Sequence, residues 1–151
     1  MFESDVAFLK FLHVIAAVTL AGIHLASFFY TMHSHRQKQG KLIRHALKVS
    51  FLNDAILVML IATIYWTAIH LQQSLRLSPN IPWIIVAHII FGMTILLWLA
   101  QLAIRVMSFN NKKILFPRCY TALSVCIWIM FALIIRDACL HSTWVTMLSS
   151  Q

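Results

Sequence analysis

Four apolar stretches fill most of this chain of 151 residues and constrain its fold more than any other feature. The stretches cover about residues 6–30, 49–71, 82–104 and 119–137. Each reaches the length of about 20 mainly apolar residues that a membrane-spanning helix needs. Hydrophobic residues make up 61% of the sequence and charged residues only 11%, which excludes a disordered chain. The sequence therefore predicts an all-α membrane protein, with four transmembrane helices in one bundle and a single domain over residues 1–151.

The positive net charge of +8 is concentrated in two of the predicted connecting loops. The second loop holds only Arg76. The first and third loops hold most of the basic residues: Arg36, Lys38, Lys41, Arg44 and Lys48 in the first, and Arg105, Lys112, Lys113 and Arg118 in the third. By the positive-inside rule, loops one and three are cytoplasmic and both termini lie outside, in the periplasm. Basic groups so placed set orientation and attract anionic membrane lipid, and no nucleic-acid partner is expected.

The amino-terminal span is expected to be retained. Glu3 and Asp5 stand where a secretory signal would carry basic residues. This feature and the compact multi-pass layout suit a bacterial inner membrane. The first span also carries two small-xxx-small pairs, which predict a close-packed face inside the bundle and are compatible with a homodimer or a larger membrane complex. The pairs are Ala17 with Ala21 and Gly22 with Ala26.

Histidines within the spans are the most informative polar residues, because a polar side chain in lipid costs free energy and normally points into the bundle. His13 and His88 each lie about five residues outward from the centre of their span, or roughly 7 Å along a helix, so both are expected at the same depth. The first and third helices run in the same direction and can present two imidazoles to one flat ligand. This arrangement predicts bis-histidine ligation of a b-type haem between helices one and three.

Further polar groups at the same outer level are candidates for holding the haem propionates. They are Lys10, His70, Arg136, Asp137 and His141. A haem at this position predicts a redox or haem-linked accessory role, with the chain as a possible component of a membrane oxidoreductase. No nucleophile–base pair or motif of established chemistry marks a catalytic residue.

A second polar group is expected near the inner leaflet. His24 lies three turns beyond His13 on nearly the same face of the first helix. Its candidate neighbours are Asn53, Asp54, Gln101 and His33. Asp54 is also expected to pair with Lys48 or Arg44 near the membrane surface.

Two other functions remain open. Met32, His33 and His35 are soft and borderline metal ligands at the inner end of the first span, and they predict a small permease or a copper-handling protein with His24 and Asp54 along the route. Alternatively, the intramembrane polar residues only pack, and the chain is a non-catalytic accessory or assembly subunit of a membrane complex.

The first span resembles the opening helix of a known superfamily. The run Leu9-Lys10-Phe11-Leu12-His13 is followed by Gly22 and by His33 just past Tyr30 and Met32. This pattern is similar to that of four-helix bacterial integral membrane proteins that include the membrane protoporphyrinogen oxidases, the copper-resistance D proteins and several uncharacterised predicted integral membrane families. With Trp98 in the third span and Gln101 and Arg105 after it, the chain looks most like one of the uncharacterised families.

The resemblance implies roles for two histidines. His13 matches the first-helix histidine that is associated with haem in the oxidase branch, and His33 matches the one at the inner end of that helix. The oxidase branch also has a lysine soon after the tryptophan that opens the third helix, whereas here Trp83 is followed by Ala87 and His88. Its Asn-Glu-x-Pro signature in the fourth helix is absent from this sequence. These departures argue against protoporphyrinogen oxidation and favour a haem-binding or redox-accessory role.

Overall fold

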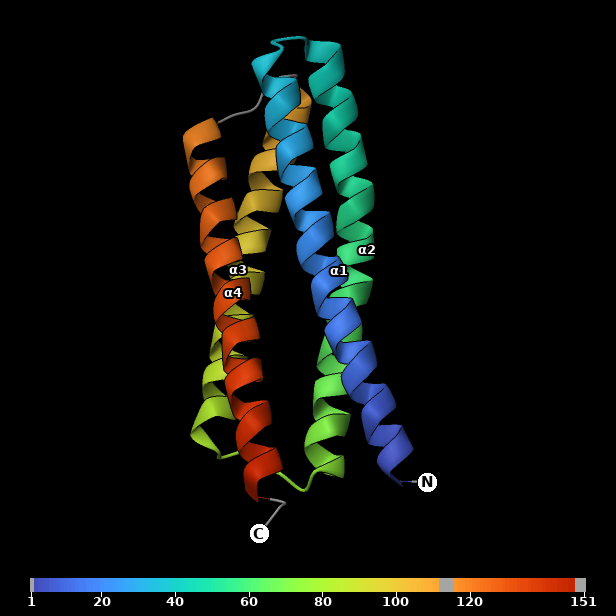
Figure 1. The fold of residues 1–151 in the computed structure, drawn as a ribbon. Coiled ribbons are helices and arrows are strands. Elements are labelled where there is room, and N and C mark those ends of the chain that lie inside the picture. Colours follow the sequence, from blue (N-terminus) through green and yellow to red (C-terminus); the bar gives the residue numbers. More distant parts are fainter. Residues whose placement is uncertain (1, 112–115, 149–151) are drawn as a thin grey trace. The chain divides into compact units, whose positions relative to one another are not determined.

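Four long helices make up the protein (Figure 1). The computed structural model describes the backbone of residues 2–111 and 116–148, with side chains from Asp5 to Asn111 and from Phe116 to Arg136. Each helix contains a segment long and apolar enough to cross a membrane, so the prediction of four spanning helices is confirmed. The helices are α1 (Phe2–Arg36), α2 (Gly40–Ser74), α3 (Pro82–Asn111) and α4 (Pro117–Leu148).

The chain divides into two compact units. Unit 1 contains α1, α2 and the end of α3 from Arg105 onward, and unit 2 contains the earlier part of α3 together with α4. The end of α3 packs on α2 through an apolar cluster in which Phe51 and Phe109 meet edge to face with ring centroids 5.8 Å apart. Arg44 lies over the Phe109 ring, 5.1 Å from its centroid. This cluster fixes the last turns of α3 against the hairpin of α1 and α2.

The helices begin where proline predicts, but they extend beyond the predicted spans. Pro82 and Pro117 are the first residues of α3 and α4, as expected for a residue tolerated in a first helical turn. In contrast, α1 continues to Arg36 and α2 already begins at Gly40, so most of the predicted first loop is helical. Lysine, arginine and glutamine are good helix formers, and the backbone hydrogen bonds therefore continue after the apolar pattern stops.

The connections are short and closed by left-handed residues. Lys38 and Arg76 have φ angles of 53° and 52°. After α2 the amide of Leu77 donates to the carbonyl of Gln72 and the amide of Arg76 donates to that of Gln73, which is the Schellman pattern of a helix end. The chain therefore turns back without glycine at either position.

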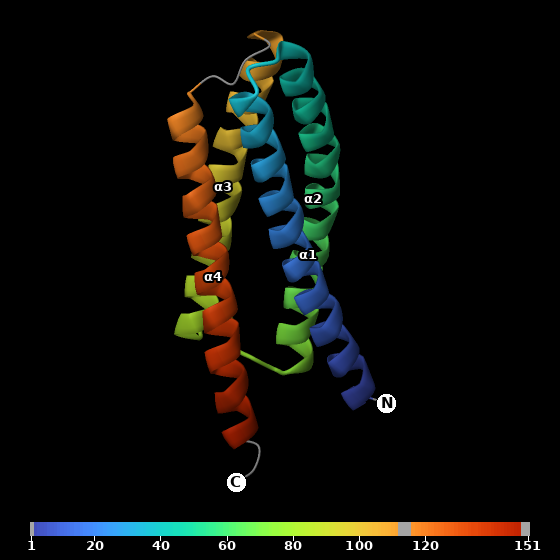
Figure 2. The same ribbon diagram turned by 45° about the horizontal axis from the view of Figure 1, so that its top comes forward.

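Helices α1 and α2 form an antiparallel hairpin and lie side by side in both views (Figures 1 and 2). Side-chain hydrogen bonds fix its register. His13 and Thr67 are equally far along the chain from Gly40, as are Ser27 and Asn53, and both pairs are bonded. Paired polar groups therefore lie at matching levels over most of the hairpin length.

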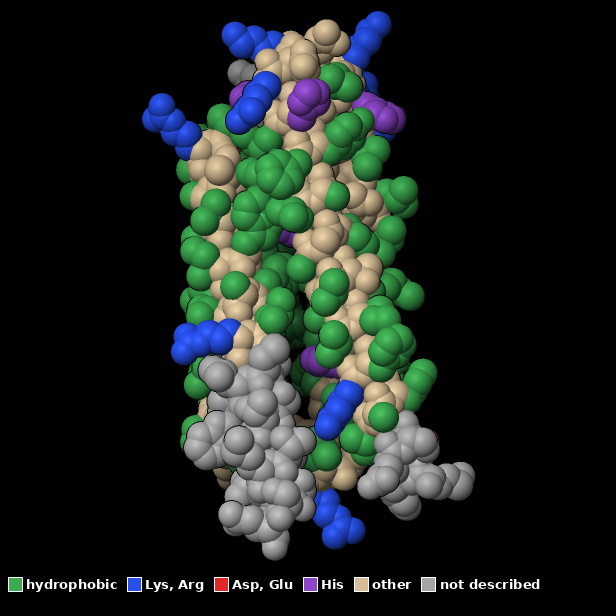
Figure 3. Space-filling model, in the orientation of Figure 1, with side chains coloured by type: hydrophobic (Ala, Val, Ile, Leu, Met, Phe, Trp, Pro, Cys, Tyr) green, Lys and Arg blue, Asp and Glu red, His purple; other side chains and the backbone are tan. Residues whose placement is uncertain are grey.

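The surface of the helices is largely apolar (Figure 3). Large side chains such as Phe11, Met59 and Leu96 are exposed, as expected for residues that contact lipid. The prediction for the small residues of α1 holds only in part. Ala17 and Ala21 are half-buried, but Gly22 and Ala26 are exposed, because the buried side of α1 follows the polar residues from His24 to Ser34 instead.

Candidate functional site

His13, on α1, has a defined protonation pattern. Its Nδ1 lies 2.8 Å from Oγ1 of Thr67 on α2. The single hydroxyl proton of Thr67 is already directed to backbone carbonyls, at 2.8 Å from Thr63 and 3.0 Å from Ile64. With its proton so directed, the Thr67 oxygen is free to accept from the imidazole, in the tautomer in which Nδ1 of His13 carries the proton and Nε2 keeps its lone pair. The imidazole is half-buried within unit 1.

His88, on α3 in unit 2, has the same tautomer for a related reason. Its Nδ1 lies 2.7 Å from the carbonyl oxygen of Ile84, one turn earlier on the same helix. A carbonyl oxygen only accepts hydrogen bonds, so Nδ1 is protonated and Nε2 again keeps the lone pair. His88 flanks the buried face of α3 and is itself exposed. Metal-ligating histidines commonly hold their second nitrogen in this way, because the bond fixes the tautomer and the ring orientation.

The candidate propionate-binding residues fall in both units. In unit 1, Lys10 is exposed, and His70 is half-buried with its ring 4.5 Å from that of Trp66 in an edge-to-face contact. In unit 2, Arg136 is exposed. The side chains of Asp137 and His141 lie outside the described residues.

An ion pair is buried within unit 1. Oδ2 of Asp54 on α2 lies 2.8 Å from Nη1 of Arg105 on α3. Only 6% of Asp54 and 2% of Arg105 are exposed. The ion pair of Asp54 is therefore with Arg105 and not with the predicted Lys48 or Arg44, both of which are exposed.

The same ion pair corrects the predicted third loop. Arg105 lies inside α3 rather than between helices. A buried charge needs a partner, and Asp54 supplies it. Arg105 therefore does not count among the loop cations from which the orientation was predicted, although Arg118 remains exposed at the start of α4.

The residues of the expected cluster around His24 have the following surroundings. His24 is buried, but Asn53 donates to Oγ of Ser27 at 2.7 Å, and Gln101 donates to Ser124 within unit 2. His33 is exposed. Two hydroxyl groups of the same hairpin also pair with each other. Thr31 and Ser50, both buried, are bonded across the hairpin at 3.0 Å.

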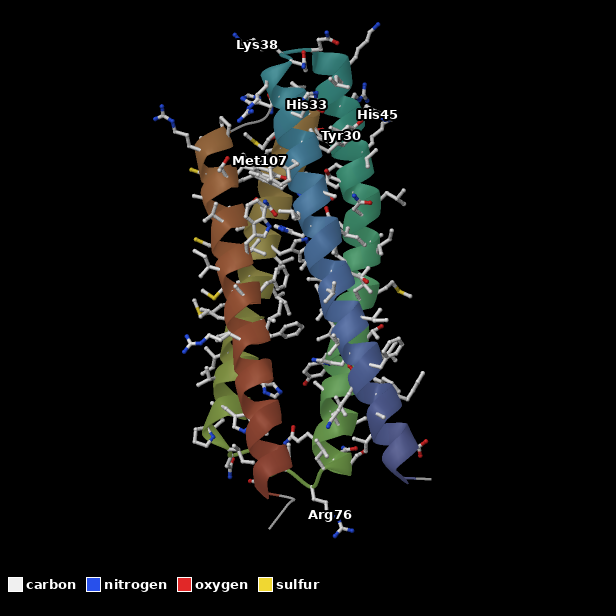
Figure 4. All side chains as sticks on the ribbon, viewed as in Figure 1. Tyr30, His33, Lys38, His45, Arg76 and Met107 are labelled. Carbon is white, nitrogen blue, oxygen red and sulfur yellow. The ribbon has the colours of Figure 1, made fainter. Side chains whose placement is uncertain are left out.

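The candidate copper ligands lie at the last turns of α1. Figure 4 places His33 close to the turn at Lys38, with Tyr30 and His45 nearby and Arg76 at the opposite end of α2. The Tyr30 and His45 rings are in edge-to-face contact at 6.4 Å. Among the described residues, no group of three or more His, Cys, Asp or Glu side chains is placed to hold a metal ion. Met32 and His35, both half-buried, complete the predicted set.

Sequence reasoning missed Thr67 and the buried role of Arg105. A signal for Arg105 exists, because the buried polar residues of α3 recur at the three- and four-residue spacing of one helix face. These residues are Thr94, Gln101, Arg105 and Ser108. Thr67 gives no such signal, since a threonine in an apolar helix usually bonds its own backbone.

Comparison with known proteins places the chain in a family. A family model described as predicted integral membrane protein (DUF2269) matches residues 7–136, a range that includes α2 and α3 and most of α1 and α4. The chain belongs to this DUF2269 family. It is an integral, multi-pass membrane protein. No curated protein and no solved structure matches it.

Proposed function

We propose that this DUF2269 protein binds a b-type haem in a bacterial inner membrane, with His13 and His88 as the axial ligands. The tautomer of the two imidazoles carries the proposal. In each unit a hydrogen bond holds Nδ1 and leaves the Nε2 lone pair for a metal. The equal depth that the sequence assigns to the two histidines adds to this support.

Other residues would serve the same site. Lys10, His70 and Arg136 are candidates to bind the propionates, because cationic and imidazole N–H groups donate to carboxylates. When bound, haem supplies one-electron redox chemistry. The chain would then act in electron transfer or as a haem-linked subunit of a membrane complex.

An absorption spectrum of the detergent-purified full chain, oxidised and then reduced with dithionite, tests the proposal. We expect a Soret band and b-type α and β bands on reduction, and we expect both to be lost in His13→Ala and in His88→Ala. His45→Ala is the matched control, since His45 contacts Tyr30 near the α1–α2 turn and belongs to no proposed ligand set. Its spectrum should equal that of the unmodified protein.

A colourless protein from haem-replete cells would contradict the proposal. Copper analysis of the same preparation would then test Met32, His33 and His35 as metal ligands. A protein free of both haem and copper would favour the accessory or assembly subunit, whose polar residues only pack.

A further inference from the structure

The guanidinium of Arg105 is only partly used by its ion pair. The Asp54 carboxylate contacts Nη1, whereas Nε and Nη2 are buried and have no hydrogen-bond partner among the described residues. A buried charged donor without an acceptor is costly, so these N–H groups call for a ligand with suitable oxygens. Nε and Nη2 are on the same edge of the guanidinium, and their N–H groups point in parallel.

That edge has a specific chemical preference. Two parallel N–H groups match the two oxygens of a carboxylate or a phosphate, and such bidentate pairs are among the strongest hydrogen-bonded contacts in proteins. We propose that the Nε–Nη2 edge of Arg105 binds a phosphate group, either that of a membrane lipid or that of a solute. This site is independent of the proposed haem.

The charge around Arg105 supports an anionic ligand. Exposed cations surround the α1–α2 turn (Figure 3). They are Arg36, Lys38, Lys41, Arg44 and Lys48. The chain has only four acidic residues, and Asp54 is the one nearest to this end of the hairpin, since Glu3 and Asp5 begin α1 and Asp137 follows in α4. The local positive potential therefore exceeds what one carboxylate can balance.

The position of Arg105 also suits an interfacial ligand. Arg105 precedes the end of α3 at Asn111 by about 9 Å of helix. Phe109, one turn beyond Arg105, is packed against Phe51, so the guanidinium is carried on a fixed segment of unit 1. A rigid arginine loses less freedom when it binds, which favours a specific contact over a diffuse attraction.

Binding measurements on the full chain in an uncharged detergent and a phosphate-free buffer test the proposal. The probes are inorganic phosphate, dioctanoyl phosphatidylglycerol and, as a lipid without phosphate, dioctanoylglycerol. We expect saturable binding of at least one of the first two probes, weakened roughly ten- to hundredfold by Arg105→Lys, which keeps the charge beside Asp54 but removes the planar fork. Binding of both indicates a phosphate site open to either source, and binding of one identifies the source.

Two controls keep the test decisive. Arg76→Lys alters an exposed arginine of the same unit at the opposite end of α2 and should leave the affinity unchanged. If Arg105→Lys does not fold, the uncharged double variant Asp54→Asn/Arg105→Gln replaces it and should lose binding. The proposal is overturned if neither phosphate probe binds, if dioctanoylglycerol binds equally well, or if the variants at Arg105 and Arg76 weaken binding equally.

Discussion

The two halves of the α1–α2 hairpin use polar side chains in different ways. In the turn half, residues 24–57, buried groups bond to one another across helices, as in Ser27 with Asn53 and Thr31 with Ser50. In the far half, residues 2–23 and 58–74, His13 bonds to Thr67 through one nitrogen and keeps a lone pair on the other. Cross-helix bonding in the turn half stabilises packing, whereas the imidazole of the far half is the one that we propose as a metal ligand.

The largest effect is expected at the ion pair of the turn half. Removing one partner, in Asp54→Leu or Arg105→Met, leaves an uncompensated buried charge and should lower the free energy of unfolding by about 3–5 kcal/mol. The double variant should recover most of this loss, since apolar residues replace both charges. Unfolding in mixed micelles measures the change, and Lys48→Met, at an exposed position, should shift stability by less than about 0.5 kcal/mol. A double variant less stable than either single one would contradict this account.

In the far half we expect a mutation to change the affinity for the proposed haem more than the stability of the fold. Thr67→Val removes the acceptor that holds Nδ1 of His13, and we expect haem affinity to fall about 10- to 100-fold. Titration of the apoprotein with haemin measures the affinity. Thr63→Val is the matched control, because the Thr63 hydroxyl donates to the Met59 carbonyl of its own helix. Equal losses in both threonine variants would show that the Thr67 bond does not orient the imidazole.

A smaller effect is expected for the hydroxyl pair of the turn half. A double-mutant cycle of Thr31→Val with Ser50→Ala should give a coupling of about 0.6 kcal/mol, the average for hydrogen bonds between membrane helices. Thr63→Val with Ser50→Ala is the control cycle and should be additive, because these two residues are not bonded. Zero coupling for Thr31 and Ser50 would mean that this pair adds nothing to packing.

The smallest effect concerns the turn that joins the two halves. Lys38 has a left-handed backbone conformation, so Lys38→Gly should stabilise the protein by about 0.5 kcal/mol. Lys41→Gly, within α2, should destabilise it by a similar amount because glycine is a poor helix former. Thermal unfolding of the two variants side by side distinguishes them. A loss of stability in both would show that the left-handed strain at Lys38 is negligible.

The sequence predicted the helices more accurately than the contacts between them. Pro82 and Pro117 marked two helix starts, since proline limits where a helix begins. The prediction for Asp54 failed because Lys48 and Arg44 are near it in sequence, whereas Arg105 lies on another helix. The sequence pattern places a positively charged residue in a loop when it follows an apolar stretch. It therefore does not recognise Arg105, whose charge is paired with Asp54 inside a helix.

The sequence by itself determined that this protein is four membrane-spanning helices, because spanning length and apolar content are local properties of each segment. It also located His13 and His88 as unusual polar residues in apolar surroundings. Only the tertiary structure decided which nitrogen of His13 carries the proton and which cation pairs with Asp54. Those outcomes depend on side chains brought together from separate helices, and their partners are distant in sequence.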